Sequence, residues 1–576
     1  MSKTVIGVHI GHNASAALVE EGQLKFALQE ERLTRTKNQG GTPRRALRQI
    51  NSDFLAGCEP LQEIPVALAG KNLAACHWRR DEILGNYGKS SAGLVGGVKR
   101  LARKNSLVSN YINQIKASSL EEEIGTSFDP CPVRASGLDH HSCHSASAYF
   151  GWGNMEDEIL VLTCDGAGDC LCATVNTAKG GKLQRVAQVS EEHSVGALFG
   201  KVTFLCGMVP MEHEYKLMGL APYAENSAEA RNIACLFNQL IEFDPKSPMR
   251  WRRKNGCPPM QLAAKYLEHL LRRKRFDHIA GGVQLFLENF LVQWVKACVR
   301  ETGIHKVALS GGVFMNVKAN QKILELPEVE EMFVFPSCGD ETNAIGAAWL
   351  YHYMTFNEVP KPLENFYLGT ESDENAADDA LRTFPFRNRV KIREQSDVEM
   401  KVADLLHRGE IVARMKGRCE FGARALGNRS ILANPSRPEA VRTINEMIKC
   451  RDFWMPFAPS VLAERSQDYF RKPKPMDAPY MIVTFDTREE KRARIPAVIH
   501  PHDATGRPQE VTERSNPDYY RLLKRFEELT GEGLVLNTSF NLHGEPIVGS
   551  PEDALRVFDL SGLQHLALGN FLISKS

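Results

Sequence analysis

The sequence has no long apolar run. None of its 576 residues lies in an apolar stretch of the roughly 18 residues that a membrane-spanning helix needs. The N-terminal segment Met1–Ile10 is strand-like and lacks the apolar core of a signal peptide. We therefore expect a cytoplasmic protein with no membrane partner.

A cysteine clamp for a structural metal is also missing. The 14 cysteines are scattered, and no Cys-x-x-Cys pair occurs. Cys170 and Cys172 alternate along an expected strand, which suits neither a disulfide nor a closed zinc site. We expect reduced, mostly buried thiols, which again favours the cytoplasm.

The sequence also lacks an excess of charge of one sign. The chain has 71 basic and 70 acidic residues, for a net charge of +1. No global field therefore favours a nucleic acid, and we expect no nucleic-acid partner. Two basic runs, Arg250–Lys254 and Arg272–Arg275, are typical of solvated faces, with an entrance for an anionic substrate as the alternative.

What the chain does contain is a repeated alternation of apolar strands and helices. Its length allows two or more domains, and Val5–Ile10 and Lys306–Ser310 read as strands. Residues 196–302 read as mainly helical, with an apolar stripe at 283, 286, 290, 294 and 295. This alternation predicts an α/β fold. Prolines and acids in 360–388 predict a boundary, followed by a second α/β unit.

Four residues form a candidate metal site. His140 and His144 stand four apart at the head of an expected helix, so both imidazoles can reach one ion. Asp165 and Asp340 each follow an apolar strand. Two imidazoles and two carboxylates suit Fe(II), Mn(II) or Zn(II). The alternatives are a polar helix face for the histidines and a helix cap for Asp340.

Glycine turns follow several of the expected strands. Gly311 and Gly312 lie between a strand and a helix that opens at Asn316. Backbone N–H groups there can approach a phosphate, although a plain strand-to-helix turn explains the same pattern. With Gly7, Gly11 and the turn at residues 165–168, they resemble the two-lobed nucleotide-binding fold of actin, hexokinase and Hsp70.

A separate set of cations lies in the C-terminal half. Arginines and a lysine alternate with Gly, Pro, Asn and Ser in four clusters, at residues 422–430, 449–459, 505–509 and 537–541. Arginine binds phosphate as a planar fork and lysine as a point charge. These clusters favour a phosphate clamp over surface salt bridges.

Together these segments resemble the NodU/CmcH-type O-carbamoyltransferases over almost the whole chain. The most specific motifs occur in family order: His140–His144, Lys216–Ala221, Gly422–Arg429, Pro456–Ser460 and Asn537–Asn541. The resemblance implies an actin-like, metal-dependent transfer domain at residues 1–365 and a YrdC-like domain at residues 389–576.

The resemblance also implies the roles of individual residues. The metal ligands are His140, His144, Asp165 and Asp340, with Fe(II) first and Mn or Zn as alternatives. The C-terminal ligand set is Arg424, Lys449, Arg507, Asn537 and Ser539, to which we add the neighbouring cations Arg429 and Arg451. Lys37 matches a family position that reaches toward that site.

The implied reaction has two stages. ATP, with Mg, and carbamoyl phosphate give carbamoyl-adenylate in the C-terminal domain. The transfer site holds the adenylate with Gly311, Gly312 and Asn316, and a hydroxyl of a small molecule, such as an antibiotic or toxin precursor, takes the carbamoyl group. His12 is our candidate to orient or deprotonate that hydroxyl, with a structural turn histidine as the alternative. A homodimer is compatible with this interpretation of the sequence.

The sequence departs from the family pattern at two positions, and three other functions are alternatives to carbamoyl transfer. The family often has Asp where Asn13 stands, and Arg where Met455 stands. A tRNA threonylcarbamoylation enzyme would carry a basic footprint. A HypF-type hydrogenase maturation protein would carry Cys-x-x-Cys modules. A non-catalytic actin-like scaffold would need neither the two histidines nor the C-terminal cations.

Overall fold

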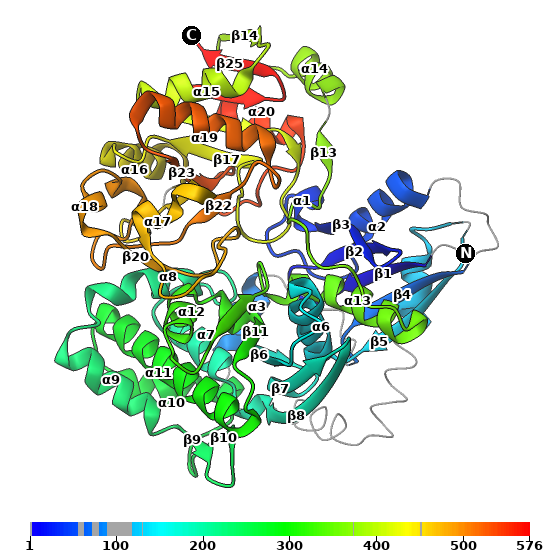
Figure 1. Cartoon of the computed structure of the whole chain (residues 1–576), viewed down its shortest axis with the longest axis vertical. Helices are drawn as coiled ribbons and strands as arrows, with labels where there is room; N and C mark the ends of the chain where they lie inside the picture. Colours follow the sequence, from blue (N-terminus) through cyan, green and yellow to red (C-terminus); the bar gives the residue numbers. More distant parts are fainter. Residues whose placement is uncertain are drawn as a thin grey trace. The chain divides into compact units, whose positions relative to one another are not determined.

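The computed structural model describes residues 3–55, 63–71, 80–88, 118–129, 131–372, 374–449 and 452–576. They form two compact units. The N-terminal unit comprises Met1–Glu30 and Asn38–Leu363, and the C-terminal unit comprises Glu31–Lys37 and Glu364–Ser576 (Figure 1). The chain therefore passes between the units three times. The predicted domain limits, 1–365 and 389–576, stay a prediction. The expected boundary segment, residues 366–388, belongs to the C-terminal unit.

The first sheet of the N-terminal unit has the strand order β3-β2-β1-β4-β5. Three strands form an antiparallel meander, and two more continue parallel to β1. Their bounds are β1 Thr4–His9, β2 Ser15–Glu20, β3 Gln23–Gln29, β4 Ile64–Ala69 and β5 Val133–Leu138.

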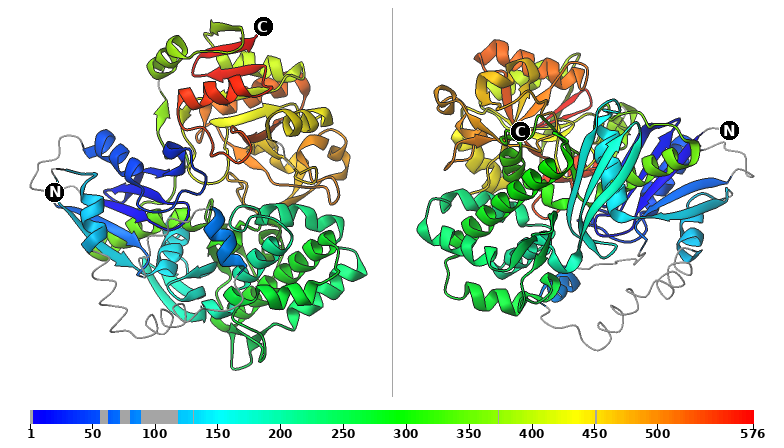
Figure 2. Two further views of the ribbon diagram at one scale, coloured as in Figure 1. Left: turned by 180° about the vertical axis from the view of Figure 1, so that it is seen from behind. Right: turned by 60° about the horizontal axis from the view of Figure 1, so that its bottom comes forward.

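The second sheet repeats this plan, with the order β12-β11-β6-β7-β8. Again three strands form a meander and two lie parallel to its first strand. They are β6 Ile159–Gly168, β7 Leu171–Lys179, β8 Lys182–Ser190, β11 Lys306–Ser310 and β12 Glu331–Val334. The duplicated topology confirms the predicted actin-like fold. Figure 2 shows the blue strands of the first sheet and the teal strands of the second from two further sides.

Two helices exchange partners between these sheets. α6 (His140–Trp152) follows β5 but packs on β6 and β11 of the second sheet. α13 (Asn343–Phe356) follows β12 but packs on β1, β2 and β4 of the first sheet, and the two helices also pack on each other. A Cβ added to Gly7 would lie 1.8 Å from Ala344 O, and one added to Gly346 would lie 2.0 Å from Cys143 O. Glycine at both positions therefore permits the close approach.

Helices fill most of the chain between β8 and β11, as predicted. They are α7 Val195–Leu205, α8 Glu214–Leu220, α9 Ala228–Asn238, α10 Ala264–Leu271 and α11 Phe276–Thr302, with α12 Val317–Leu324 after β11. The predicted stripe of α11 is buried at Val283, Phe286, Phe290, Trp294 and Val295. The prediction missed an antiparallel hairpin of β9 (Ile241–Asp244) and β10 (Ser247–Arg253). Other helices of this unit include α2 Arg44–Ile50 and α3 Arg80–Tyr87.

The C-terminal unit is built on a mixed eight-stranded sheet, in the order β14-β25-β24-β15-β17-β23-β18-β22. The strands are β14 Val390–Glu394, β15 Val412–Met415, β17 Arg429–Ala433, β18 Ala458–Leu462, β22 Gln509–Val511, β23 Leu534–Ser539, β24 His565–Leu568 and β25 Phe571–Lys575. α15 (Val398–His407) and α19 (Pro517–Thr530) pack on the sheet and on each other around one buried apolar core. α20 (Pro551–Leu560) packs on β24 and β15.

Shorter elements complete this unit. They are α1 Glu31–Thr34, β13 Glu371–Ser372, α14 Glu374–Thr383, β16 Gly417–Arg418, α16 Pro438–Ile444, the π-helical turn Asn445–Lys449, α17 Ser466–Tyr469, β19 Phe470–Arg471, β20 Phe485–Thr487, α18 Glu489–Arg492 and β21 Thr505–Gly506. Within the described ranges of the whole chain, no helix combines the length and apolarity required to span a bilayer.

Candidate active sites

The first candidate site begins at the N-terminus of α6. Asp139 caps this helix, because its carboxylate accepts the backbone N–H of Ser142 at 2.8 Å. His140 and His144 are therefore one turn apart on one face, with ring centroids separated by 4.8 Å. Both imidazoles are buried.

Two carboxylates reach this face from the second sheet. Asp165 lies near the end of β6, where the pairing with β7 becomes irregular between Cys164 and Gly168. Its Oδ1 accepts the backbone N–H of Gly312 at 2.9 Å. Asp340 opens the 3₁₀ turn Asp340–Thr342 immediately before α13. The exchange of α6 and α13 between the sheets thus brings Asp340 against the histidines.

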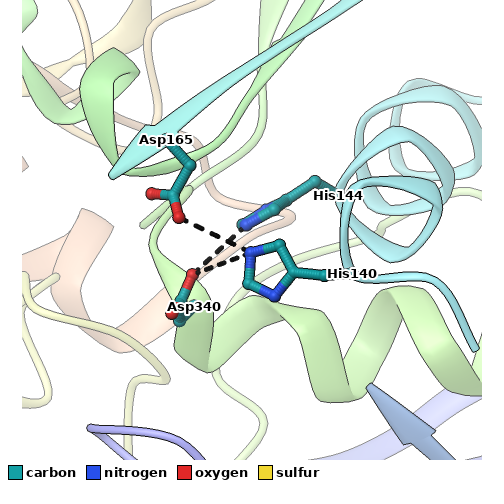
Figure 3. Close-up of side chains that lie close together, drawn as sticks. All are labelled: His140, His144, Asp165 and Asp340. Carbon is teal, nitrogen blue, oxygen red and sulfur yellow. Dashed lines mark hydrogen bonds and ion pairs between the residues drawn. The ribbon is translucent and has the colours of Figure 1, made fainter. Parts of the chain in front are cut away.

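The structure brings all four predicted ligands together. Nε2 of His140 lies 3.5 Å from Asp165 Oδ2 and 3.4 Å from Asp340 Oδ1, and Nε2 of His144 lies 3.3 Å from the same Asp340 oxygen. One donor atom from each residue lies within 4.8 Å of all the others. Figure 3 shows the two rings on one helix pointing toward the two carboxylates.

The chemistry of this group fits a metal ion. Nε2 of His140 is buried and makes no hydrogen bond of good geometry to the carboxylates beside it. Burial disfavours the charged imidazole, but Asp340 and Asp165 raise the pKa of His140 well above its usual value. Burial also favours neutral Asp340, yet His140 and His144 hold the pKa of that carboxyl well below its usual range. The surroundings of the two imidazoles therefore stabilise positive charge, and two nitrogens with two oxygens can bind a divalent cation.

Neighbouring polar groups orient the two rings. His144 Nδ1 lies 3.2 Å from the Ser310 hydroxyl, and the side-chain amide nitrogen of Asn343 lies 3.1 Å from His144 Nε2. The same amide nitrogen lies 3.5 Å from His140 Nδ1. Ser310 ends β11 and Asn343 opens α13. Neither residue was predicted to orient the histidines.

His12 lies at the more open side of the group. Its Nδ1 is 3.5 Å from Asp340 Oδ2, and its side chain is 28% exposed. The preceding His9 is buried, and burial lowers its pKa to about 4, so it is neutral near pH 7. Asn13 has a positive φ of 59° and accepts a 2.7 Å hydrogen bond from Gln29. His12 is thus in reach of the metal group, and its catalytic role stays a prediction.

The predicted adenylate-binding turn has structural contacts of its own. Gly311 has a φ of 104°, and a Cβ there would lie 2.3 Å from Cys164 O, so this position requires glycine. Asn316 caps α12 by accepting from Ala319 N at 3.0 Å, and its amide also pairs with Gln284. Adenylate binding by Gly311, Gly312 and Asn316 stays a prediction.

The second candidate site lies in the C-terminal unit around Lys449. Its buried ammonium donates to Ser539 Oγ at 3.1 Å and to the backbone oxygen of Ser539. It also donates to Asn541 O at 3.0 Å and to Asn541 Oδ1 at 2.5 Å. These contacts join the π-helical turn before residue 450 to the end of β23.

Three strands supply an amide and hydroxyl cluster next to this end of β23. Asn537 donates to Ala425 O at 3.1 Å, to Ser460 Oγ at 2.8 Å and to Gln509 Oε1 at 3.2 Å. All three polar side chains are at most 2% exposed. Oδ1 of Asn537 is buried without a hydrogen-bond partner. Asn537 was predicted, whereas Ser460 and Gln509 were inside the quoted motifs but were not selected.

A buried carboxylate organises the glycine-bearing loop at residues 422–429. Oε1 of Glu420 accepts the backbone N–H groups of Leu426, Asn428 and Arg429, at 2.8, 2.8 and 3.0 Å. Glu420 was not predicted, although it lies just before the motif Gly422–Arg429. Arg424 within this loop is partly exposed.

Arg429 contacts the backbone of its own unit. Its guanidinium is fully buried and donates to the backbone oxygens of Lys416, Gly417 and Asn428, at 3.1, 2.9 and 3.1 Å. Its Nε is buried without a hydrogen-bond partner, and binding of phosphate by Arg429 stays a prediction. Arg507 is partly exposed and Lys37 is exposed. Arg451 lies outside the described residues, and Met455 is buried.

Two family models match the chain over both candidate sites. The model described as Carbamoyltransferase N-terminus matches residues 4–349, and Carbamoyltransferase C-terminus matches residues 403–575. The two matches fall almost entirely on the two structural units.

Similar proteins extend over nearly the whole sequence. Nodulation protein NolNO of Sinorhizobium fredii is 31% identical, with 98% of this chain and 79% of the relative covered. An uncharacterized protein of Methanocaldococcus jannaschii is 31% identical, with 99% of both chains covered. Nodulation protein U of Sinorhizobium fredii is 26% identical over 94% of both.

Full-length HypF in its phosphate- and nucleotide-bound form is a similar solved structure. It has a TM-score of 0.35 and 15% identity, with 61% of this chain and 55% of that chain covered. A TM-score this low does not establish a shared fold. The actin-like assignment rests instead on the two sheets of duplicated topology.

An actin-like unit with a buried His/Asp group, followed by a second unit built on a mixed sheet, defines the class as a two-unit α/β protein with a candidate metal site. More particularly, the chain belongs to the carbamoyltransferase family. The predicted relation to the NodU-type carbamoyltransferases is confirmed, and with it the prediction that the chain is an enzyme that transfers a carbamoyl group.

Proposed function

We propose that this carbamoyltransferase works in two stages. The C-terminal unit makes carbamoyl-adenylate from ATP and carbamoyl phosphate, and the N-terminal unit transfers the carbamoyl group to a hydroxyl of a small-molecule acceptor. The observation that carries this proposal is the separation of two kinds of site. A buried His/Asp group lies in one unit, and a lysine, amide and hydroxyl cluster lies in the other.

In the first stage carbamoyl phosphate loses phosphate to water, and the resulting carbamate attacks the α-phosphorus of ATP. Carbamoyl-adenylate forms and pyrophosphate leaves, with Mg carried by ATP. The ammonium of Lys449 is held by Ser539 and Asn541, so its charge is already oriented before the phosphates arrive. Fixed charge of this kind stabilises a crowded anionic transition state without reorganisation. Arg424, Arg507 and Arg451 would supply further cations.

In the second stage the acceptor hydroxyl attacks the carbamoyl carbon, and AMP leaves with the bonding electrons. His140, His144, Asp165 and Asp340 would hold a divalent ion, with Fe(II) our first choice, and such an ion supplies Lewis acidity toward an oxygen of the adenylate. Asp340 Oδ2 faces Nδ1 of His12, which leaves the opposite ring nitrogen available to take the hydroxyl proton. The turn Gly311–Gly312 and Asn316 would contact the AMP portion.

The test separates the two stages. Exchange of labelled pyrophosphate into ATP should require carbamoyl phosphate. His140→Ala should retain this exchange but lose transfer from supplied carbamoyl-adenylate, and Arg507→Ala should show the converse. Exchange without carbamoyl phosphate, or loss of both activities in each variant, would contradict the scheme. A mass-spectrometric screen of hydroxylated metabolites for the gain of one carbamoyl group identifies the acceptor.

A further inference from the structure

A short segment from the N-terminal part of the sequence is built into the C-terminal unit. Residues Glu31–Lys37 lie in sequence between β3 and α2, which both belong to the N-terminal unit, yet they pack with Glu364–Ser576. Arg32 is buried and donates to Gly422 O at 2.5 Å. A Cβ added to Gly549 would lie 2.5 Å from Arg32 O, so the segment contacts this backbone closely.

Arg35 makes the most specific contacts of the segment. Its two terminal nitrogens donate to Ile547 O at 2.6 Å and to Pro546 O at 2.8 Å. Nε lies 3.2 Å from Asp553 Oδ1, and the side chain is 21% exposed. A planar guanidinium can bridge two successive carbonyls and a carboxylate, which a lysine ammonium cannot do in the same geometry.

The carbonyls that Arg35 holds are continuous with the site around Lys449. Asn541 donates to Glu545 O at 2.7 Å and to Leu542 O at 3.0 Å, which closes the chain from 541 to 545 into a compact loop. The same side chain accepts from Lys449 Nζ at 2.5 Å. One end of this loop therefore holds the ammonium, and the other end is held by Arg35.

We infer that Arg35 is a positioning residue for the adenylate-forming site. It fixes the loop Asn541–Ile547, and through Asn541 it sets the place of the Lys449 ammonium. This inference rests on the proposed function, because only the first stage uses Lys449. Arg35 itself touches no reacting atom in this scheme.

The test uses the full chain with Arg35→Ala, Arg35→Lys and a control, Arg521→Ala. Arg521 is also in the C-terminal unit, but its side chain is 53% exposed, and its ion pairs with Asp397 and Asp518 lie at the surface. Displacement of a catalytic group by about 1 Å can cost on the order of 100-fold in rate. We therefore expect carbamoyl phosphate-dependent pyrophosphate exchange to fall by roughly 10- to 100-fold in both Arg35 variants. The control should keep the wild-type rate.

Two further readouts separate positioning from loss of folding. Transfer from supplied carbamoyl-adenylate should remain within about twofold of wild type, because the His/Asp group belongs to the N-terminal unit and Arg35 packs with the C-terminal unit. Hydrogen exchange of the amides at 541–549 should accelerate in Arg35→Ala, and added guanidinium ion should restore part of the pyrophosphate exchange.

Each other outcome overturns the inference. Wild-type exchange rates in Arg35→Ala, or full activity in Arg35→Lys, would show that the planar contact does not position Lys449. Equal loss of both half-reactions with a lower Tm would make Arg35 a fold anchor only. If the wild-type chain shows no carbamoyl phosphate-dependent exchange, the proposed function fails. In that case unchanged protection at 541–549 in Arg35→Ala also overturns the coupling, while accelerated exchange sustains it.

Discussion

Asn343 is fully buried beside both imidazoles of the metal group, and its Oδ1 has no hydrogen-bond partner. Its amide nitrogen faces His144 Nε2 and His140 Nδ1. The oxygen and nitrogen of a side-chain amide exchange places by a half-turn. With an ion at the group, the half-turn would let Oδ1 accept a hydrogen bond from the Nδ1–H group of His140, and partners of this kind fix the tautomer of a ligating histidine.

We therefore expect Asn343→Ala to weaken divalent-metal binding by roughly 10- to 100-fold, measured by competitive titration against a coloured chelator. Asn320→Ala is the matched control, because Asn320 is equally buried and donates instead to Phe314 O at 2.7 Å. Equal metal affinity in both variants would contradict the role of Asn343.

His193, which is not part of the His/Asp group, should make the free energy of unfolding depend on pH. Burial, with help from Arg253, lowers the pKa of His193, and its Nδ1 accepts the backbone N–H of Arg253 at 3.2 Å. The unfolded chain therefore binds more protons than the folded chain below about pH 7, near the ordinary histidine pKa of about 6.5. The contribution of His193 to stability is complete above that pH and declines as pH falls. The free energy of unfolding of His193→Gln should depend less on pH between about 7 and 5 than that of wild type; parallel curves would contradict this.

The ligands of the metal group could be predicted because each has a local signal. His140 and His144 have helical spacing, and Asp165 and Asp340 follow apolar strands. Ser310 and Asn343 could not be selected, since a hydroxyl and an amide acquire their role only when two helices from different parts of the chain cross. The sequence could not report that the guanidinium of Arg429 donates to three backbone carbonyls, and phosphate binding by this residue stays a prediction.

At the scale of elements, the crossing of α6 and α13 positions the metal group. Glycine at position 346 allows α13 to approach Cys143 O, one residue from His144. The strands around this crossing were predictable from their apolar runs. The hairpin β9–β10 was missed because its charged residues, among them Glu242, Arg250 and Arg252, interrupt the apolar alternation that marks a strand.

Gly346→Ala should separate the two helices. A Cβ placed 2.0 Å from a backbone oxygen forces the backbone to move, and overpacking of this kind costs roughly 3 kcal/mol of unfolding free energy. We expect a lower Tm together with weaker metal binding. The control is Gly85→Ala in α3, where an added Cβ has nothing within 4 Å. If Gly346→Ala behaves like this control, the close packing of the helices does not support the site.

At the scale of the whole molecule, the two candidate sites should respond differently to removal of the metal. The His/Asp group belongs to the N-terminal unit and Lys449 to the C-terminal unit. A chelator selective for transition metals, used with Mg in excess, should abolish transfer from supplied carbamoyl-adenylate and leave pyrophosphate exchange near its initial rate. Added Fe(II) should restore transfer. Equal loss of both activities would place the metal in both stages or in the fold.

The two α/β halves could be predicted from the alternation of strands and helices. For Glu31–Lys37, only the family resemblance at Lys37 pointed toward the C-terminal site, and the contacts of Arg35 could not be predicted. Seven residues between β3 and α2 carry no periodic pattern that assigns them to either half. Their place depends on backbone oxygens at Pro546 and Ile547, which no side-chain pattern reports.

That segment has a consequence for the order of events during synthesis. A ribosome releases a chain from its N-terminus, so N-terminal domains generally fold first. Arg35 emerges long before Pro546, Ile547 and Asp553 exist, because it lies in sequence between β3 and α2 of the N-terminal unit. The C-terminal unit is therefore complete only when nearly the last residues have been made. A chain that stops before residue 546 would present Arg35 with none of its acceptors.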